Sequence, residues 1–372
     1  MYKRQDTLEA ETLRGLRRTL DVGDFLGVEG IIWLTRTGEI TVDASDAVIL
    51  SKALRPLPEK WAGVQDREIC YRRRYLDLLT NEETRARFRF RARLVKSMRN
   101  FLDDHGFEEV ETPVLETKVS GALAKPFVSH HNALDMSVTM RIAPETWLKR
   151  LIVGGYERVY EFARCFRNEG MDPSHLQDFT MLEYYVAYWS YEENMAFTQK
   201  LLQHVVQETT GSLTFTPPGS DTPIDISGDW PRRRMTDLIK EKAGLDVLEV
   251  RDEDALRAWI RERKLPIDGI EKMGYPTLVD QIYKKTVRPQ LISPMFLIGH
   301  PIELSPLARR NDETPGITDR FQLLINGWEV VNAYSELVDP VEQRGRFESQ
   351  AAAKAAGDEE ALDVDEDYLR AM

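Results

Sequence analysis

Charged side chains interrupt two neighbouring stretches of the sequence that otherwise have the composition of buried strands. Alternate residues of a strand point to the same face, and the loop 170–177 would join the two strands as an antiparallel pair. One face of that pair then carries the following side chains: Arg167, Glu169, Phe179, Glu183 and Tyr185. So many charges do not fit a packed core, so the face is either a network of buried ion pairs or the floor of a ligand site.

A second group of polar residues follows an Asn-Gly turn signal in LLINGWEVVNAYSEL. Asn332, Tyr334 and Glu336 fall on one face of the strand after that turn. Glu329 has the opposite parity and joins them only if a bulge or a turn intervenes.

Three carboxylates are candidates to line one cation site. Glu145 is expected at the start of a helix just past a strand, and Glu183 and Glu336 belong to the two strand faces above. Such a site suits a small cationic ligand. Arg167 nearby suits a carboxylate or a phosphate, because a guanidinium binds these groups through two parallel hydrogen bonds.

Residues 84–104 are predicted to form an amphipathic helix. Phe90, Leu94, Met98 and Phe101 recur at spacings of four and three residues. The opposite side is basic and carries these residues: Arg85, Arg87, Arg89, Arg91, Arg93, Lys96 and Arg99. This basic side is either solvated, with its stems covering apolar surface, or it contacts a partner or RNA.

Strands and helices alternate after residue 140. The segment 140–170 reads as strand, helix, strand. Ser190 with Glu193 predicts a capping box that opens a helix to about Thr209. Residues 211–290 show a mixed and less regular pattern.

The chain before residue 81 has a different character. Residues 22–42 alternate short β runs with Gly-Asp and Thr-Gly turns, which indicates two or three strands of a small barrel or meander. The prolines and glycine of LRPLPEKWAG, residues 54–63, predict a linker.

The composition is that of an ordinary globular protein. The chain has 372 residues, 42% of them apolar and 30% charged, with a formal charge of −12. It has no apolar run of about 18 residues and no apolar signal segment, so we expect no membrane span and a cytoplasmic location. The acidic balance argues against electrostatic capture of nucleic acid by the whole protein. Cys70 and Cys165 are too few for a disulfide framework or a metal site.

Several segments together resemble the class II aminoacyl-tRNA synthetases over residues 20–372. FRNEG, the loop with His175 and DFTMLEYY resemble motif 2 of that family, and GFEEVETPVL resembles motif 1. Three further segments resemble the lysyl-tRNA synthetases in particular: RIAPETWLKRL, SPLARR and NAYSEL. The aspartyl and asparaginyl enzymes are not similar in the last of these.

The resemblance implies an α+β fold, a class II antiparallel sheet flanked by helices and preceded by a partial OB-type β-barrel. It implies an anticodon-binding domain at 1–57, a linker at 58–80 and a catalytic domain at 81–372. It also implies a homodimer through motif 1, with the segments 84–104 and 106–113 facing the second subunit.

The implied activity is that of a lysine–tRNA ligase. Such an enzyme uses ATP and Mg²⁺ to convert lysine to lysyl-adenylate, then passes lysine to tRNA(Lys). Arg167 would bridge the lysine carboxylate and the α-phosphate; Glu169, His175 and Phe179 would contact ATP, and Glu329 would hold Mg²⁺. The implied lysine pocket consists of these residues: Gly121, Glu145, Glu183, Tyr185, Asn332, Tyr334 and Glu336.

Three features depart from the family pattern. The chain ends at DEDYLRAM, before the Gly-rich motif 3 whose Arg packs over ATP, and the first barrel strands with most anticodon contacts are expected to be absent. Gln322 lies where the family usually has a second acidic Mg²⁺ ligand, and Leu176-Gln177-Asp178 replaces a more usual Asn-Pro-Glu. Two alternatives therefore stand beside the ligase: a lysine-activating paralogue with a non-tRNA acceptor, and an inactive fragment that acts as a binding module.

Overall fold

The computed structural model describes most of the chain, namely residues 9–55, 57, 64–118, 121–122, 124–171, 175–218, 220–355 and 364–372. The chain divides into two compact units, and each is a body by itself: residues 1–92 and 93–372. The linker predicted at 54–63 lies mostly outside the described residues, because residue 56 and residues 58–63 are not among them.

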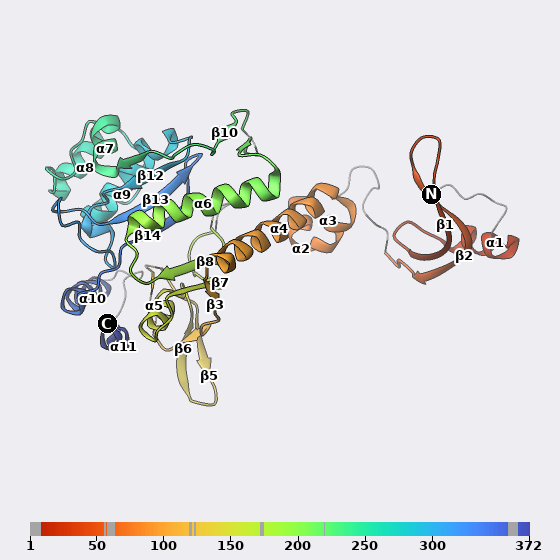
Figure 1. Cartoon of the computed structure of the whole chain (residues 1–372), viewed down its shortest axis with the longest axis horizontal. Helices are drawn as coiled ribbons and strands as arrows, with labels where there is room; N and C mark the ends of the chain where they lie inside the picture. The colour runs from red at the N-terminus through yellow and green to blue at the C-terminus, as the bar shows by residue number, and fades with distance from the viewer. Residues whose placement is uncertain are drawn as a thin grey trace. The chain divides into compact units, whose positions relative to one another are not determined.

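The first unit contains an antiparallel hairpin and a helix packed on it (Figure 1). The hairpin consists of β1 (Phe25–Leu34) and β2 (Ile40–Ser51), and α1 spans Ala10–Thr19. Leu16 of α1 packs against Ala44 of β2 in a small buried cluster. Two of the two or three predicted strands are therefore present in the described residues, and closure into a barrel stays a prediction.

Two short helices, α2 (Arg67–Arg72) and α3 (Arg74–Thr80), occupy the described part of the stretch predicted as a linker. Asp66 caps α2 by accepting hydrogen bonds from the backbone N–H groups of Glu68 and Ile69. The domain boundaries after residues 57 and 80 stay predictions.

The long basic helix is present as α4 (Glu82–Asp104), which confirms the prediction over 84–104. Its C-terminal part packs in the second unit, where Phe101 and Leu102 are buried. Arg99 lies 3.0 Å from a carboxylate oxygen of Glu109, and its guanidinium sits 4.4 Å from the ring centre of Phe162. This arginine therefore covers apolar surface with a charged group, as the solvated alternative expects.

Two sheets of the second unit carry the candidate site (Figure 1). The first has the order β3-β7-β8: Glu108–Glu109, Arg158–Phe166 and Asp178–Val186. The second has the order β11-β12-β13-β14: Arg232–Arg234, Met295–Ile298, Arg320–Ile325 and Trp328–Tyr334. The pairs β7–β8, β12–β13 and β13–β14 are antiparallel, which confirms the expected sheet type, while β3 and β11 join their neighbours in parallel.

The second unit also contains a three-stranded sheet with the order β4-β6-β5 and the two-stranded pair β10-β9. Their strands are β4, β5, β6, β9 and β10: Leu115–Glu116, Val128–His131, Met136–Met140, Thr214–Phe215 and Ile224–Asp225. The C-terminal helices are α10 and α11: Pro340–Ala355 and Glu366–Ala371.

Helix α6 (Tyr191–Thr210) packs on one face of both main sheets. Its Leu201 lies in a buried cluster with Tyr184 of β8, and its Met195 lies in another with Val331 of β14. Strand side chains alternate between faces. The neighbours of Tyr184 and Val331 along each strand therefore point away from α6, and these neighbours include the predicted site residues.

The start of α6 follows the predicted cap. Ser190 and Glu193 form the capping box there. Helix α5 spans Glu145–Val153 and is flanked by Pro144 and Gly154.

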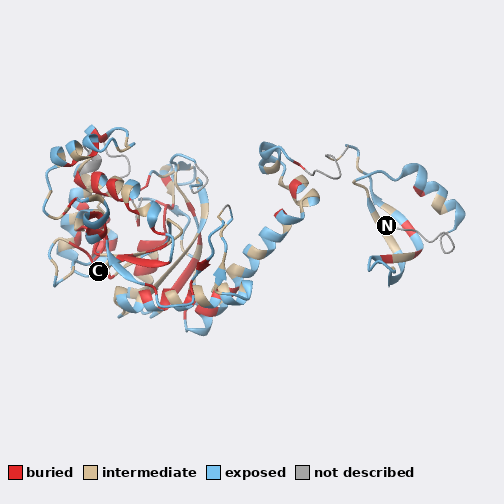
Figure 2. Cartoon of the chain, turned by 90° about the horizontal axis from the view of Figure 1, so that it is seen from above, coloured by how far each residue is buried: buried red, intermediate tan, exposed pale blue. Residues whose placement is uncertain are grey.

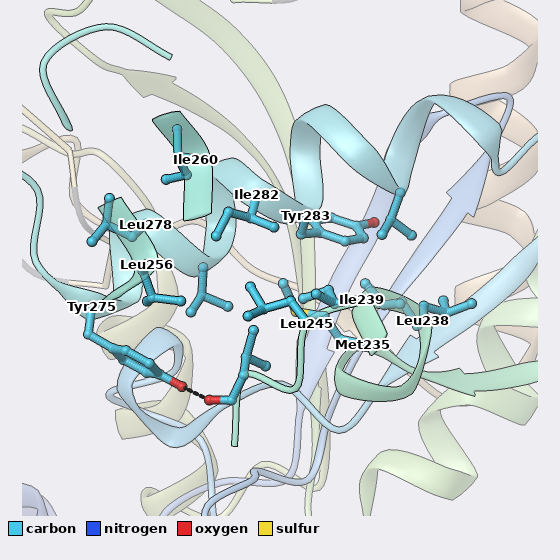
Figure 3. Close-up of a cluster of buried hydrophobic side chains, with 14 of the residues drawn as sticks. Met235, Leu238, Ile239, Leu245, Leu256, Ile260, Tyr275, Leu278, Ile282 and Tyr283 are labelled. Atoms are coloured by element: carbon cyan, nitrogen blue, oxygen red, sulfur yellow. Dashed lines mark hydrogen bonds between the residues drawn. The ribbon is translucent and has the colours of Figure 1, made fainter. Parts of the chain in front are cut away.

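The region 211–290, predicted as mixed and less regular, is mixed, since it contains the short strands β9, β10 and β11. It also contains three regular helices that were not predicted. The helices are α7, α8 and α9: Met235–Ala243, Glu253–Glu262 and Tyr275–Thr286. Their apolar sides meet in a buried cluster that includes Leu238, Leu256 and Ile282 (Figure 3). Leu297 and Leu324 of the second sheet join this cluster, so the helices cover part of the sheet face opposite α6. Figure 2 shows buried residues on these helices and on the sheet.

None of the helices among the described residues is long and apolar enough to span a membrane.

Candidate functional site

The face predicted on β7 and β8 is present along the paired strands, whereas Arg167 and Glu169 lie beyond the end of β7 at Phe166. Glu161 lies opposite Glu183 in the register, and Cys165 lies opposite Phe179. The inner end of this face is a buried ion pair, since Glu161 Oε1 lies 2.7 Å from Arg141 Nη1. Both alternatives, a buried ion pair and the floor of a ligand site, therefore apply in part. Glu161 and Arg141 form the buried ion pair, and polar side chains of β8 lie beside it.

A bulge in β14 brings Glu329 to the polar face, as the residue spacing required. Gln322 lies opposite Asn332, whereas Leu324 lies opposite Glu329, so two residues of β13 oppose three of β14. Gln322 Nε2 donates a 2.8 Å hydrogen bond to Glu329 Oε2. The preceding turn has positive φ at both central residues, 54° and 71°, which fits the Asn-Gly signal.

Glu336 lies just past the end of β14, and the segment 305–310 holds it there. Ala308 forms an antiparallel bridge with Glu336. The backbone N–H of Arg309 donates to the carbonyl of Ser335 at 2.8 Å. Two sequence segments that resembled the same family thus pair with each other.

Arg320 of β13 braces Asn332. Its Nε donates a 2.8 Å hydrogen bond to Asn332 Oδ1. Its Nη1 donates to the carbonyl of Leu304 at 2.7 Å and to Ser305 Oγ at 2.9 Å. The side chain of Asn332 is therefore tied to the loop that precedes Ala308.

Gly121 lies against the start of α5. Its φ of 87° favours glycine, and a Cβ added there would come within 2.9 Å of Glu145 Cβ and 3.3 Å of Ala143 Cβ. Gly121 therefore lies close to Glu145, one of the three candidate carboxylates.

A buried ammonium group joins two of these carboxylates. Lys149 Nζ lies 2.6 Å from Glu145 Oε1 and 2.5 Å from Glu336 Oε2. The Lys149 side chain is 7% exposed, the Glu145 side chain 8% and the Glu336 side chain 32%. The hydroxyl of Tyr334 donates a hydrogen bond to Glu145 Oε1.

Aromatic rings surround the same ammonium. Lys149 Nζ lies 5.4 Å from the ring centre of Tyr334 and 5.8 Å from those of Tyr185 and Tyr368. Tyr185 also donates a 3.3 Å hydrogen bond to Glu183 Oε2. Carboxylates and aromatic faces both stabilise an ammonium ion, so this environment has the chemistry of a cation pocket.

The pKa values of the pocket carboxyl groups are raised. Burial raises the pKa of Glu183 to about 8, and the nearby charge of Glu145 adds to the effect. Burial likewise raises the pKa of Glu336 to about 7, although the Lys149 ammonium opposes the rise. Burial disfavours the charged form of Lys149, but Glu145 and Glu336 outweigh it and hold the pKa of this ammonium well above its ordinary value.

Arg167 lies beside Phe179 with donor capacity left over. Its guanidinium carbon is 5.2 Å from the ring centre of Phe179. Among the described residues, its buried Nε has no hydrogen-bond partner, and its Nη2 makes a long 3.5 Å contact to the carbonyl of Ile142. A buried N–H group that lacks a partner is costly unless a ligand satisfies it, which suits an anion site.

The other two predicted ATP contacts lie on the segment between β7 and β8. Glu169 Oε1 accepts a 3.2 Å hydrogen bond from the backbone N–H of Lys125, and Glu169 is exposed. His175 is exposed and follows residues 172–174, which are outside the described set.

Two charged residues of the site escaped the sequence interpretation. Lys149 had a visible signal, since it follows Glu145 by four residues on one helix. Arg320 had a weaker signal, since its pairing with Asn332 depends on the hairpin register.

The structure thus brings together Glu145, Glu183, Tyr185, Tyr334 and Glu336 through contacts with one another or with Lys149. Gly121 adjoins this group through Glu145, and Asn332 lies on the face of Tyr334. Arg167 and Phe179 form a neighbouring pair. Glu329 pairs with Gln322 on the second sheet.

The family model "tRNA synthetases class II (D, K and N)" matches residues 66–372. The chain belongs to this family of class II synthetases. The chain is similar to proteins named lysine–tRNA ligase. It is 47% identical to that of Carboxydothermus hydrogenoformans, over all of this chain and 75% of the relative. It is 44% identical to that of Staphylococcus haemolyticus and 47% identical to that of Syntrophomonas wolfei, in each case over all of this chain and 74% of the relative.

Proposed function

We propose that this protein is a lysine–tRNA ligase, which activates lysine with ATP and transfers it to tRNA(Lys). One observation carries the substrate assignment: carboxylates and tyrosine rings surround a primary ammonium group, that of Lys149. A pocket that binds the ammonium of a lysine side chain within the fold has the chemistry to bind that of free lysine. Similarity over all of this chain, and over about three quarters of each relative, to proteins named lysine–tRNA ligase supports the same assignment.

The proposed lysine pocket comprises the residues predicted from the sequence: Gly121, Glu145, Glu183, Tyr185, Asn332, Tyr334 and Glu336. The carboxylates would accept hydrogen bonds from the two ammonium groups of lysine. An analogue with an uncharged tail would leave buried carboxylates unpaired, so discrimination against it would be strong.

Arg167 is the proposed catalytic residue. Its unsatisfied donor would bind the lysine carboxylate and the α-phosphate of ATP together. A lysine carboxylate oxygen forms a bond to the α-phosphorus as the bond to the leaving pyrophosphate breaks. Arg167 would align the two groups and stabilise the negative charge that develops on the phosphate. Glu169, His175 and Phe179 would hold the rest of ATP, with Phe179 stacked on the adenine.

The second step transfers the activated lysine. A terminal ribose hydroxyl of the tRNA attacks the carbonyl carbon of lysyl-adenylate, and AMP leaves with the bonding electrons. The amino acid stays bound to the same carboxylates, so the pocket would position both steps.

Glu329 fits a magnesium ligand that shares the ion with ATP. Mg²⁺ prefers oxygen and is usually held by one or two carboxylates together with substrate phosphates. The described residues contain no group of three or more His, Cys, Asp or Glu side chains arranged for a metal. Glu329, with Gln322 beside it, therefore suits a shared ion, and bound Mg²⁺ would neutralise phosphate charge.

We further propose a homodimer formed through the motif 1 region and action in the cytoplasm, where tRNA is charged. Family membership supports both. Size-exclusion chromatography with light scattering tests the dimer, and a monomer at micromolar concentration would refute it.

Lysine-dependent exchange of pyrophosphate into ATP tests the activation step. We expect exchange with lysine alone among the amino acids, reduced at least about 100-fold in Arg167→Ala, because charge stabilisation of this kind contributes about 10²–10³. Arg164→Ala is the matched control, since Arg164 is an exposed arginine of β7 that pairs with Asp178 at 3.5 Å. A folded wild-type chain without exchange would refute the proposed activity; exchange without charging of tRNA would favour a paralogue with another acceptor.

A further inference from the structure

Lys149 is a buried charge that the proposed chemistry does not use. It lies on α5, one turn after Glu145, and its ammonium contacts carboxylates that come from α5 and from the end of β14. A lysine that is 7% exposed loses its hydration, and its two carboxylate partners offset the free-energy cost of that loss. Lys149 thus joins Glu145 and Glu336, which lie far apart in the sequence of the second unit.

The charges around the cation pocket have a simple sum. The pocket carries three carboxylates, Glu145, Glu183 and Glu336, and one ammonium, Lys149. With every group ionised, their net charge is −2. Free lysine presents two ammonium groups to this set and keeps its carboxylate for Arg167. Burial raises the pKa values of Glu183 and Glu336 to about 8 and about 7, so the pocket charge matches the two cationic groups of the substrate once these two groups have lost their protons.

We propose that Lys149 is a specificity-determining positioning residue that holds Glu145 and Glu336 together and sets the pocket charge to that of the two lysine ammonium groups. This inference rests on the proposed function, since it takes lysine as the ligand. Lys149 itself makes no bond that changes during the reaction.

The surroundings of Lys149 support this role. The groups that face it are Glu145 from α5, Glu183 and Tyr185 from β8, Tyr334 from β14, Glu336 after β14 and Tyr368 from α11. The pKa values of Tyr185 and Tyr334 are held well above the ordinary value by burial and by nearby carboxylates, and burial raises that of Tyr368 to about 12. These hydroxyls are therefore neutral near pH 7. The net charge of the pocket near pH 7 therefore depends on the carboxyl groups, on Lys149 and on the more distant Arg167.

Removing the Lys149 charge has a defined consequence. Lys149 lowers the pKa values of Glu183 and Glu336, while Glu145 raises both. Without the ammonium, these carboxyl groups would hold their protons to higher pH, and incoming lysine would have to displace them. Each unit of pKa increase weakens binding about tenfold at a pH below both values.

The experiment uses isothermal titration of L-lysine into the full chain between pH 6 and pH 9, in two buffers of different ionisation enthalpy. We expect Lys149→Met to weaken lysine binding about tenfold at pH 7, to release more protons per lysine than wild type, and to recover affinity at higher pH. Lys149→Arg should restore much of the loss. In pyrophosphate exchange, the KM for lysine should rise while the KM for ATP stays within about twofold.

Lys240→Met is the matched control. Lys240 lies on α7, outside the pocket, and pairs with Asp246 at 2.8 Å. A double variant, Lys149→Met with Glu145→Gln, removes one charge of each sign. It leaves one carboxylate, Glu336, without the ammonium where the single variant leaves two, so it should be less destabilised than the single variant. We expect the double variant to return to the wild-type proton count, even if the single variant does not fold.

The outcomes separate the two proposals. Wild-type protein that binds no lysine would overturn the proposed function and this inference with it. Wild-type protein that binds lysine, together with a folded Lys149→Met variant of unchanged affinity and proton release, would overturn this inference alone. Tighter lysine binding by Lys149→Met would also overturn it, because Lys149 would then compete with the substrate. A double variant whose proton count departs from wild type would do the same.

Discussion

Gly121 offers a sharp test of the proposed lysine pocket, because the structure defines what a side chain would meet there. In Gly121→Ala the new Cβ would lie 2.9 Å from Glu145 Cβ. Carbon atoms in contact rest about 3.5–4.0 Å apart, so Glu145 or the glycine segment must shift by about 0.6–1.1 Å. A misplacement of about 1 Å can cost about 100-fold in rate. We expect kcat/KM for lysine to fall about 10- to 100-fold.

Two energies add up in this variant. A non-glycine residue in the left-handed region costs about 1–2 kcal/mol, and Gly121 has a φ of 87°. Overpacking against Glu145 and Ala143 costs a further 1–3 kcal/mol or so. The free energy of unfolding should therefore fall by about 2–5 kcal/mol, which denaturant titration measures.

Gly211→Ala isolates the backbone strain. Gly211 is the C-cap of α6 and has a φ of 78°, and no atom of the described residues lies within 4 Å of a Cβ built there. This control should lose about 1 kcal/mol of stability and keep the wild-type KM for lysine. The assay is pyrophosphate exchange at varied lysine and saturating ATP. If Gly121→Ala loses no more stability than Gly211→Ala and keeps the wild-type kcat/KM, the placement of Gly121 against the pocket is refuted.

Three further predictions concern the Ser190 cap of α6, the hydrogen bond from Arg320 to Asn332 and the pH dependence of stability. Ser190→Ala removes the α6 capping box and should lower the free energy of unfolding by about 1 kcal/mol in urea titration, without changing the KM for lysine; a changed KM would contradict the separation of cap and site. Arg320→Lys should raise the KM for lysine in exchange assays through loss of the fixed bond to Asn332, whereas an unchanged KM would show that this brace is dispensable. Glu116, which accepts a 2.8 Å hydrogen bond from Trp147 Nε1, has a pKa that burial raises from 4.5 to about 7. The folded state then binds more protons than the unfolded state, so this group removes stability as the pH rises from about 4.5 to about 7; Glu116→Gln should flatten that decline in thermal unfolding, and an unchanged slope would refute it.

The strand faces of the site were predictable from residue parity. Strand period, turn chemistry and bulge geometry act over a few residues, so the sequence contains them. The polar face of β8 and the need for a bulge at Glu329 followed from that local rule, and the structure has both. The Ser190 cap followed in the same way.

The three-helix region was not predicted, although each helix has an apolar side. Helices α7 and α8 span only 9 and 10 residues, near the length at which periodicity stops distinguishing helix from strand. Their cores form only when Leu256 of α8 meets Leu278 of α9 and Leu297 of β12. That packing depends on contacts distant in sequence, which no short window contains.

For the Lys149 pocket, the sequence allows candidate residues to be proposed, but it does not reveal the ion pairs that these residues form. Glu145 and Lys149 are neighbours on one helix, so the sequence alone favours a simple surface pair between them. Only the bridge between Ala308 and Glu336 brings a second carboxylate to the same ammonium. Because Glu336 lies past the end of β14, its position depends on that long-range pairing rather than on strand parity. Loosening the segment 305–310 should therefore impair lysine binding before it unfolds the sheet.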